Sequence, residues 1–227
     1  LVVEPDKQEQ LAAYLSTLRD LESEATPFER TFIGWADAVA RADVASQVRF
    51  LELSLDHAPR NRITLINLAQ LRFGLGEFAR ALEALSYPLS TNWRFPPLYH
   101  LAALCHIQLA QHERAAEALR RALDLPQVTP EVYSLLEALA LAEDDSEAAA
   151  LYRARYDRRV EELLPERYVP DLTGPLLRIV HGLAADGRLG PAERVLRKLW
   201  RDEPPADRSL FDDLALVHED HAVRHLT

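Results

Sequence analysis

Three histidines near the carboxyl end have the spacing of a metal-binding helix face. His218, His221 and His225 stand at i, i+3 and i+7, so on a helix they share one side. Imidazoles presented in this way can bind zinc or nickel. Histidines also occur at helix carboxyl ends without a metal, because their partial positive charge suits the helix dipole there. We favour that second interpretation and predict no metal site and no cofactor.

A cysteine beside a histidine is the nearest approach to a catalytic pair. Cys105 directly precedes His106, and a thiol with an adjacent base can act as a nucleophile. Neighbouring residues on a helix point about 100° apart, however, so these two side chains cannot face each other. We expect Cys105 to be a packed core residue. The chain also lacks a glycine-rich phosphate loop, a G-x-S-x-G motif and an H-E-x-x-H motif. We predict no catalytic residues and no enzymatic activity.

A basic stretch is the third candidate, as a site for phosphate or for an acidic partner. It contains Arg153, Arg155, Arg158 and Arg159. Acidic residues are interleaved with these arginines, which favours a solvated helix face with ion pairs at i, i+4. The whole chain has 26 basic and 36 acidic residues, a net charge of −10 that repels phosphate. We therefore predict no nucleic-acid partner and no anionic membrane partner.

The composition indicates which elements must position any site. The 227 residues are 48% hydrophobic and rich in alanine, leucine, arginine and glutamate, which favours helices over strands. One cysteine excludes a disulfide framework and a cysteine-based zinc site. No apolar run approaches the roughly 18–20 residues of a membrane span. The sequence predicts an all-α, soluble protein with enough apolar surface for a continuous core.

An internal repeat organises most of the chain. Ala81, Ala115 and Ala149 recur every 34 residues, and Ala192 follows after 43. Each stands within a similar pattern of apolar residues at i, i+3, i+4 and i+7, which is typical of helices with one buried face. An alanine at a helix crossing lets two helix axes approach within about 8–10 Å. Such helix pairs cannot bury their apolar faces alone, so stacking is expected.

This pattern resembles the tetratricopeptide repeat, a helix–turn–helix unit of 34 residues. Leu68 and Ala69 match its Leu-Gly pair, and Gly76 and Phe78 match the residues of its turn. The four alanines match its small position, and the match covers roughly residues 28–206. Four residues depart from the family pattern: Arg72, His106, Glu137 and Arg153. The resemblance implies a right-handed α-α superhelix of about five helix pairs with terminal capping helices.

Three regions follow from this assignment. We expect an N-terminal amphipathic helix within residues 1–26, spanning 5–23, then a repeat array over 27–206, and a C-terminal capping helix over 207–227. The extra nine residues before the last pair place an insertion near 164–172, after a second helix that extends to about Glu162. Gly76 and Gly187 are expected to adopt the left-handed conformation at helix ends.

In the tetratricopeptide family the first helices of successive pairs line a concave groove that usually holds a partner peptide. If the register holds, the predicted binding residues are Phe32, Ile66, Gln70, Phe73, His100, Leu104, Ile107, Gln108 and His181. Ser134, Ala138 and Leu141 of the fourth pair would line the same groove. This lining is mostly apolar, which suits an amphipathic segment better than an acidic one. The alternative is that the terminal helices of the chain, or a second copy of it, cover the groove.

The resemblance implies a non-catalytic adaptor or scaffold that binds a protein or peptide segment, with a homodimer also compatible. The alternative is a sensor or dimerisation segment of a larger transcriptional or signalling regulator. The chain contains no methionine, so we expect it to be a mature fragment or part of a longer protein. We expect a bacterial, cytoplasmic protein, or a periplasmic one if a signal peptide has been removed.

Overall fold

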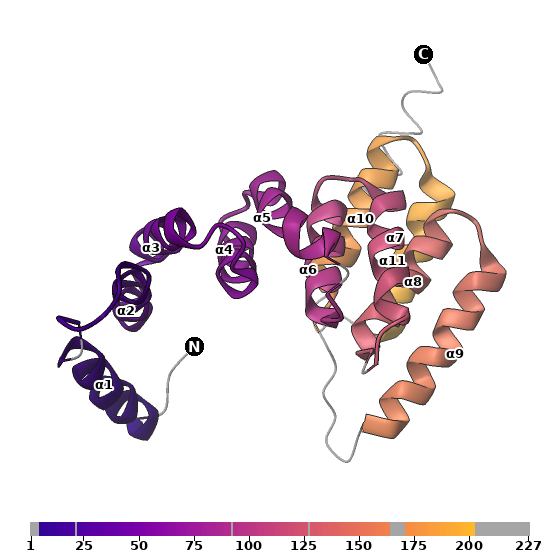
Figure 1. Cartoon of the computed structure of the whole chain (residues 1–227). Coiled ribbons are helices and arrows are strands. Elements are labelled where there is room, and N and C mark those ends of the chain that lie inside the picture. The colour runs from indigo at the N-terminus through magenta and orange to yellow at the C-terminus, as the bar shows by residue number, and fades with distance from the viewer. Residues whose placement is uncertain (1–4, 21, 92, 127, 164–170, 203–227) are drawn as a thin grey trace. The chain divides into compact units, whose positions relative to one another are not determined.

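The computed structural model of the chain describes residues 5–20, 22–91, 93–126, 128–163 and 171–202, and eleven helices lie within these ranges. The helices form two compact units that divide after Arg94 (Figure 1). Unit 1 contains α1 (Pro5–Asp20), α2 (Pro27–Ala40), α3 (Val44–His57), α4 (Arg62–Gly74) and α5 (Phe78–Ser90). Unit 2 contains α6 (Pro96–Gln108), α7 (His112–Leu123), α8 (Pro130–Ala142), α9 (Ser146–Leu163), α10 (Thr173–Ala185) and α11 (Leu189–Asp202).

Ten of the described helices form five sequential antiparallel pairs, which confirms the predicted all-α fold class. The pairs are α2 with α3, α4 with α5, α6 with α7, α8 with α9, and α10 with α11. The N-terminal helix ends at Asp20, three residues before the predicted end, and α9 reaches Leu163, close to the predicted Glu162. The predicted C-terminal helix lies outside the described residues. The division between α5 and α6 falls inside the predicted repeat array and was not predicted from the sequence.

Local sequence signals define the helix starts and the turns within pairs. The Thr26 side chain caps α2, and Glu29 closes a reciprocal capping box with it. Asp43 and Asn61 accept backbone hydrogen bonds at the starts of α3 and α4. The turn inside each pair places one residue at positive φ, and these are Ala42, Gly76, Ala110, Asp144 and Gly187. These positions follow the repeat spacing, so the repeat governs the backbone as well as the side chains.

Small residues permit close helix packing, as the repeat predicted. Ala81 and Ala115 are fully buried, and Ala149 and Ala192 are nearly so. Gln47 occupies the equivalent position in the first pair and is also buried, with its amide 3.4 Å from the Ala38 carbonyl. These positions form the centre of each pair.

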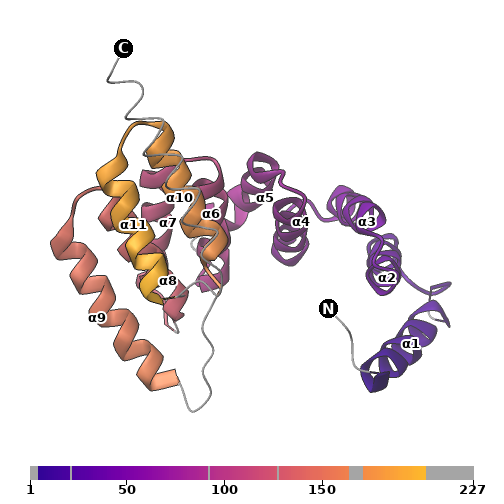
Figure 2. The same cartoon turned by 180° about the vertical axis from the view of Figure 1, so that it is seen from behind.

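The fifth pair does not extend the stack in the regular way. In a regular solenoid each repeat contacts only its neighbours, so the fifth pair would not contact the third. Here α10 packs against α6 and α8, and α11 packs against α8. Both views of unit 2 show α10 and α11 beside α6 and α8, with α9 at the outer edge (Figures 1 and 2). The fifth pair therefore lies over the first helices of pairs three and four.

Candidate binding surfaces

The surface of unit 2 that the sequence predicts as a groove is covered by α11. The Lys198 ammonium of α11 donates to the Ser134 hydroxyl of α8 at 2.8 Å and lies 3.4 Å from the Glu137 carboxylate. Each of these three residues is at most 3% exposed. A buried ammonium is stable only with such compensating partners. The α8 position predicted to face a partner peptide therefore faces another helix of the same chain.

Asp202 and two arginines extend this buried charge cluster. Asp202 accepts hydrogen bonds from Lys198 at 2.6 Å and from Arg153 of α9 at 2.6 Å, and Arg201 donates to both Asp202 and Glu137. Burial acts to raise the pKa of Asp202, but hydrogen bonds from Arg201, Lys198 and Arg153 and the charge of Lys198 lower it to about 2. The carboxylate stays ionised and joins α11 to α9, while Lys198 and Arg201 join the same cluster to α8.

Arginines of the fifth pair also satisfy carbonyls at the ends of α6 and α8. The last carbonyls of a helix lack intrahelical partners and carry the negative end of its dipole. Arg178 donates to the Gln108 carbonyl at 3.2 Å and Arg188 to the Ala142 carbonyl at 2.6 Å. Arg194 donates to the Leu141 carbonyl at 3.4 Å and pairs with Asp144. These bonds fix the fifth pair at the carboxyl ends of both first helices.

The predicted site residues of unit 2 have unequal access to a partner. Ile107 is fully buried, while Leu104 and Gln108 are half-buried. His100 is largely buried, and burial lowers the pKa of its imidazole. His181 is exposed, but it lies on α10, a helix of the covering pair. The structure therefore does not bring these five side chains together as one open lining.

Unit 1 has an open apolar pocket between α1, α2 and α4. Its volume is about 560 Å³, and its lining residues are Leu18, Glu24, Ala25, Phe28, Glu29, Phe32, Ile33, Asn61, Ile63 and Thr64. Phe32 is 43% exposed and Ile63 is 64% exposed. We call this set the unit 1 groove. It places two large apolar side chains in water on the first helices of adjacent pairs.

Of the four binding residues predicted in unit 1, Phe32 lines the unit 1 groove and the three on α4 do not. Ile66 is 7% exposed and packs in the core, and Phe73 is half-buried with its ring against Phe78 at a centroid distance of 5.4 Å. Gln70 is exposed on α4 outside the groove lining. The isoleucine of α4 that lines the groove is Ile63, whereas the sequence predicted Ile66. An available signal was that Ile63 lies apart from the buried stripe containing Leu65, Leu68 and Ala69.

The described residues contain no cluster of three or more histidine, cysteine or acidic side chains that could hold a metal ion. His218, His221 and His225 lie outside the described residues. No helix in the described ranges is long and apolar enough to cross a membrane.

Comparison with solved structures places this arrangement among known repeat folds. A tetratricopeptide repeat protein from Parabacteroides merdae matches with a TM-score of 0.56 and 18% identity, covering 87% of this chain and 76% of that chain. The chain has the tetratricopeptide-repeat fold. No family model matches the sequence, and no curated protein matches it either.

Two further structures resemble this tetratricopeptide-repeat chain. The crystal structure of MamA protein has a TM-score of 0.56 and 16% identity, covering 78% of this chain and 92% of that chain. A chain of the APC/C hetero-tetramer Cut9–Hcn1 has a TM-score of 0.58 and 16% identity, covering 94% of this chain and 40% of that chain. At these identities the likeness concerns the fold alone.

Proposed function

We propose that the protein is a non-catalytic adaptor that binds the apolar face of an amphipathic partner segment in the unit 1 groove. The observation that supports this proposal is the contrast between the two units. Phe32 and Ile63 are open to water in unit 1, whereas the corresponding face of unit 2 is covered by its own helices. Binding would remove the exposed part of both side chains from water; because full burial of such a side chain contributes about 1.5–3 kcal/mol and both are already partly buried, each would contribute about half of that.

Polar residues at the edge of the groove favour a partner with basic residues beside its apolar face. Glu24 and Glu29 both line the groove, and no lysine or arginine among the described side chains does. Glu29 is held by Thr26, whose hydrogen bonds lower the pKa of that carboxyl, so it stays ionised. A cationic amphipathic helix therefore matches both the apolar lining and its charge.

Binding of a labelled amphipathic helix made of leucine and lysine tests this proposal by fluorescence anisotropy. A Phe32→Glu, Ile63→Glu double variant should weaken binding by at least about tenfold, because two carboxylates would enter the apolar contact. The matched control is Leu53→Glu, Leu75→Glu, since both leucines are exposed in unit 1 but outside the groove.

A second peptide with the same leucines and lysines in scrambled order has the same charge but no apolar helix face. Comparing the two peptides therefore separates an apolar contact from charge attraction. We expect the scrambled peptide to bind weakly to every form, and circular dichroism to show unchanged helicity in both double variants. Equal loss of binding in the two double variants, or equal affinity for the scrambled peptide, would exclude the unit 1 groove as the site.

A further inference from the structure

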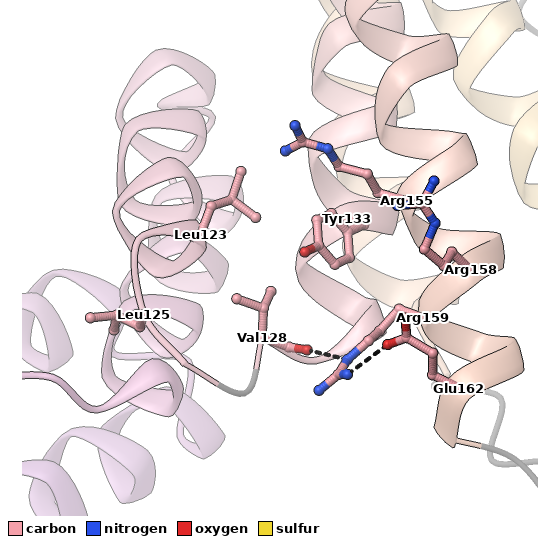
Figure 3. Close-up of a pocket in the computed structure, with 8 residues that line it drawn as sticks. All are labelled: Leu123, Leu125, Val128, Tyr133, Arg155, Arg158, Arg159 and Glu162. Carbon is pink, nitrogen blue, oxygen red and sulfur yellow. Dashed lines mark hydrogen bonds and ion pairs between the residues drawn. The ribbon is translucent and has the colours of Figure 1, made fainter.

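A second pocket lies in unit 2, between α9 and the segment that follows α7. It has a volume of about 360 Å³, and its lining residues are Leu123, Leu125, Val128, Tyr133, Arg155, Arg158, Arg159 and Glu162. Figure 3 shows Leu123 on α7 opposite Arg155 on α9, with Tyr133 of α8 between them. We call this set the arginine pocket. It shares no residue with the buried charge cluster that holds α11.

The three arginines stand at i, i+3 and i+4 and so share one face of α9. Arg159 is fixed, because its Nε donates to the Val128 carbonyl at 3.0 Å and its Nη1 to Glu162 at 2.9 Å (Figure 3). Arg155 and Arg158 are exposed and make no hydrogen bond or ion pair with any residue that the structure describes. The expectation that acidic neighbours neutralise this basic stretch therefore holds for Arg153, which pairs with Asp157, and for Arg159, but not for these two.

The charge of the pocket contrasts with that of the chain. Its lining carries three guanidinium groups and one carboxylate, although the chain as a whole has a net charge of −10. The rest of the lining is apolar or aromatic, from Leu123, Leu125, Val128 and Tyr133. Two cations with no partner among the described residues, beside an apolar wall, suit a ligand that carries both an anionic group and an apolar side chain.

We propose that the arginine pocket binds an acidic peptide segment of a partner protein. A glutamate or aspartate carboxylate would accept hydrogen bonds from Arg155 and Arg158, since the guanidinium fork matches a carboxylate with two parallel donors. A neighbouring apolar side chain of the segment would pack on Leu123 and Val128. This inference concerns a different unit and a partner of opposite charge from the proposed function, so each can fail without the other.

The test uses the whole chain and a short fluorescein-labelled peptide that repeats Glu-Glu-Leu, followed by anisotropy. An Arg155→Glu, Arg158→Glu double variant should weaken binding by at least about tenfold. The matched control is Arg114→Glu, Arg120→Glu on α7, because these exposed arginines also have no partner among the described residues and the charge change is the same. The control should lower affinity by no more than about twofold through net charge alone.

Two further peptides identify the chemistry that is recognised. Replacing glutamate by glutamine should abolish binding, and replacing leucine by glycine should weaken it while the carboxylates remain. Equal weakening by both double variants would overturn the proposal, since general attraction would explain it. Tight binding of the glutamine peptide would overturn it as well. The proposal would also be overturned if a peptide with phosphoserine in place of glutamate bound about tenfold more tightly, because phosphate would then be the preferred anion.

Discussion

The left-handed residue in each turn shows what the repeat demands of single positions. The five equivalent turns contain Ala42, Gly76, Ala110, Asp144 and Gly187, all at positive φ. Glycine adopts this conformation without a steric penalty, whereas an alanine Cβ costs roughly 1–2 kcal/mol there. Ala42 and Ala110 therefore carry backbone strain that the packing of their helix pairs must offset.

Replacing Ala110 by glycine should relieve this strain. We expect the free energy of unfolding of unit 2 to rise by about 0.5–1 kcal/mol, after allowance for the greater freedom of glycine in the unfolded chain. Urea unfolding followed by circular dichroism measures the change. Ala150→Gly, at an exposed position inside α9, is the control and should lower stability by about 1 kcal/mol. A loss of stability in both variants would show that the positive φ at Ala110 carries no strain.

At the scale of helices, the residues that break the repeat pattern have specific partners. Glu137 and Arg153 replace a small and an aromatic residue of the family, and they bind Arg201 and Asp202 of α11 respectively. Arg72 pairs with Glu52 at 2.8 Å. His106 shares a hydrogen bond with Gln111 at 2.8 Å. Two of the four departures thus hold the fifth pair against α8 and α9.

Acid should weaken this attachment through Asp202. Because the pKa of Asp202 is lowered from 3.8 to about 2 in the folded chain, its stabilisation is fully present above about pH 4 and is lost as the pH falls through about 2. The loss amounts to about 2 kcal/mol. We expect Asp202→Asn to be less stable than the parent at pH 7 by a similar amount, and the two to converge near pH 2.

Urea unfolding at a series of pH values measures that convergence. Asp124→Asn is the control, since Asp124 is exposed and forms no ion pair among the described residues. A constant difference between the parent and Asp202→Asn from pH 7 to pH 2 would show that this carboxylate gains nothing from its cationic partners.

At the scale of the whole molecule, the sequence predicted the helix pairs but not the position of the last pair. Periodicity and small residues depend on contacts within a pair, so Ala81 and Ala115 identified the crossings correctly. The insertion signalled an irregular connection, yet spacing alone cannot give the direction in which the next helices turn. Apolar residues on first helices were assigned to the groove, but Ile66 and Ile107 are buried because each first helix also supplies the core of its unit.

The first-helix face is open in unit 1 and covered in unit 2, and thiol modification tests this claim directly. The experiment uses Cys105→Ala as the parent chain. Cys105 is fully buried and burial raises the pKa of its thiol to about 12, so this substitution removes a thiol that does not react in the folded chain. Single cysteines would replace Ile63 in the unit 1 groove and Ser134 beneath α11. We expect the thiol at 63 to react with a maleimide at nearly the rate of the urea-unfolded chain, and the thiol at 134 to react at least about a hundredfold more slowly. Equal, rapid modification at both positions would contradict the claim, because the fifth pair would then leave the face of unit 2 open.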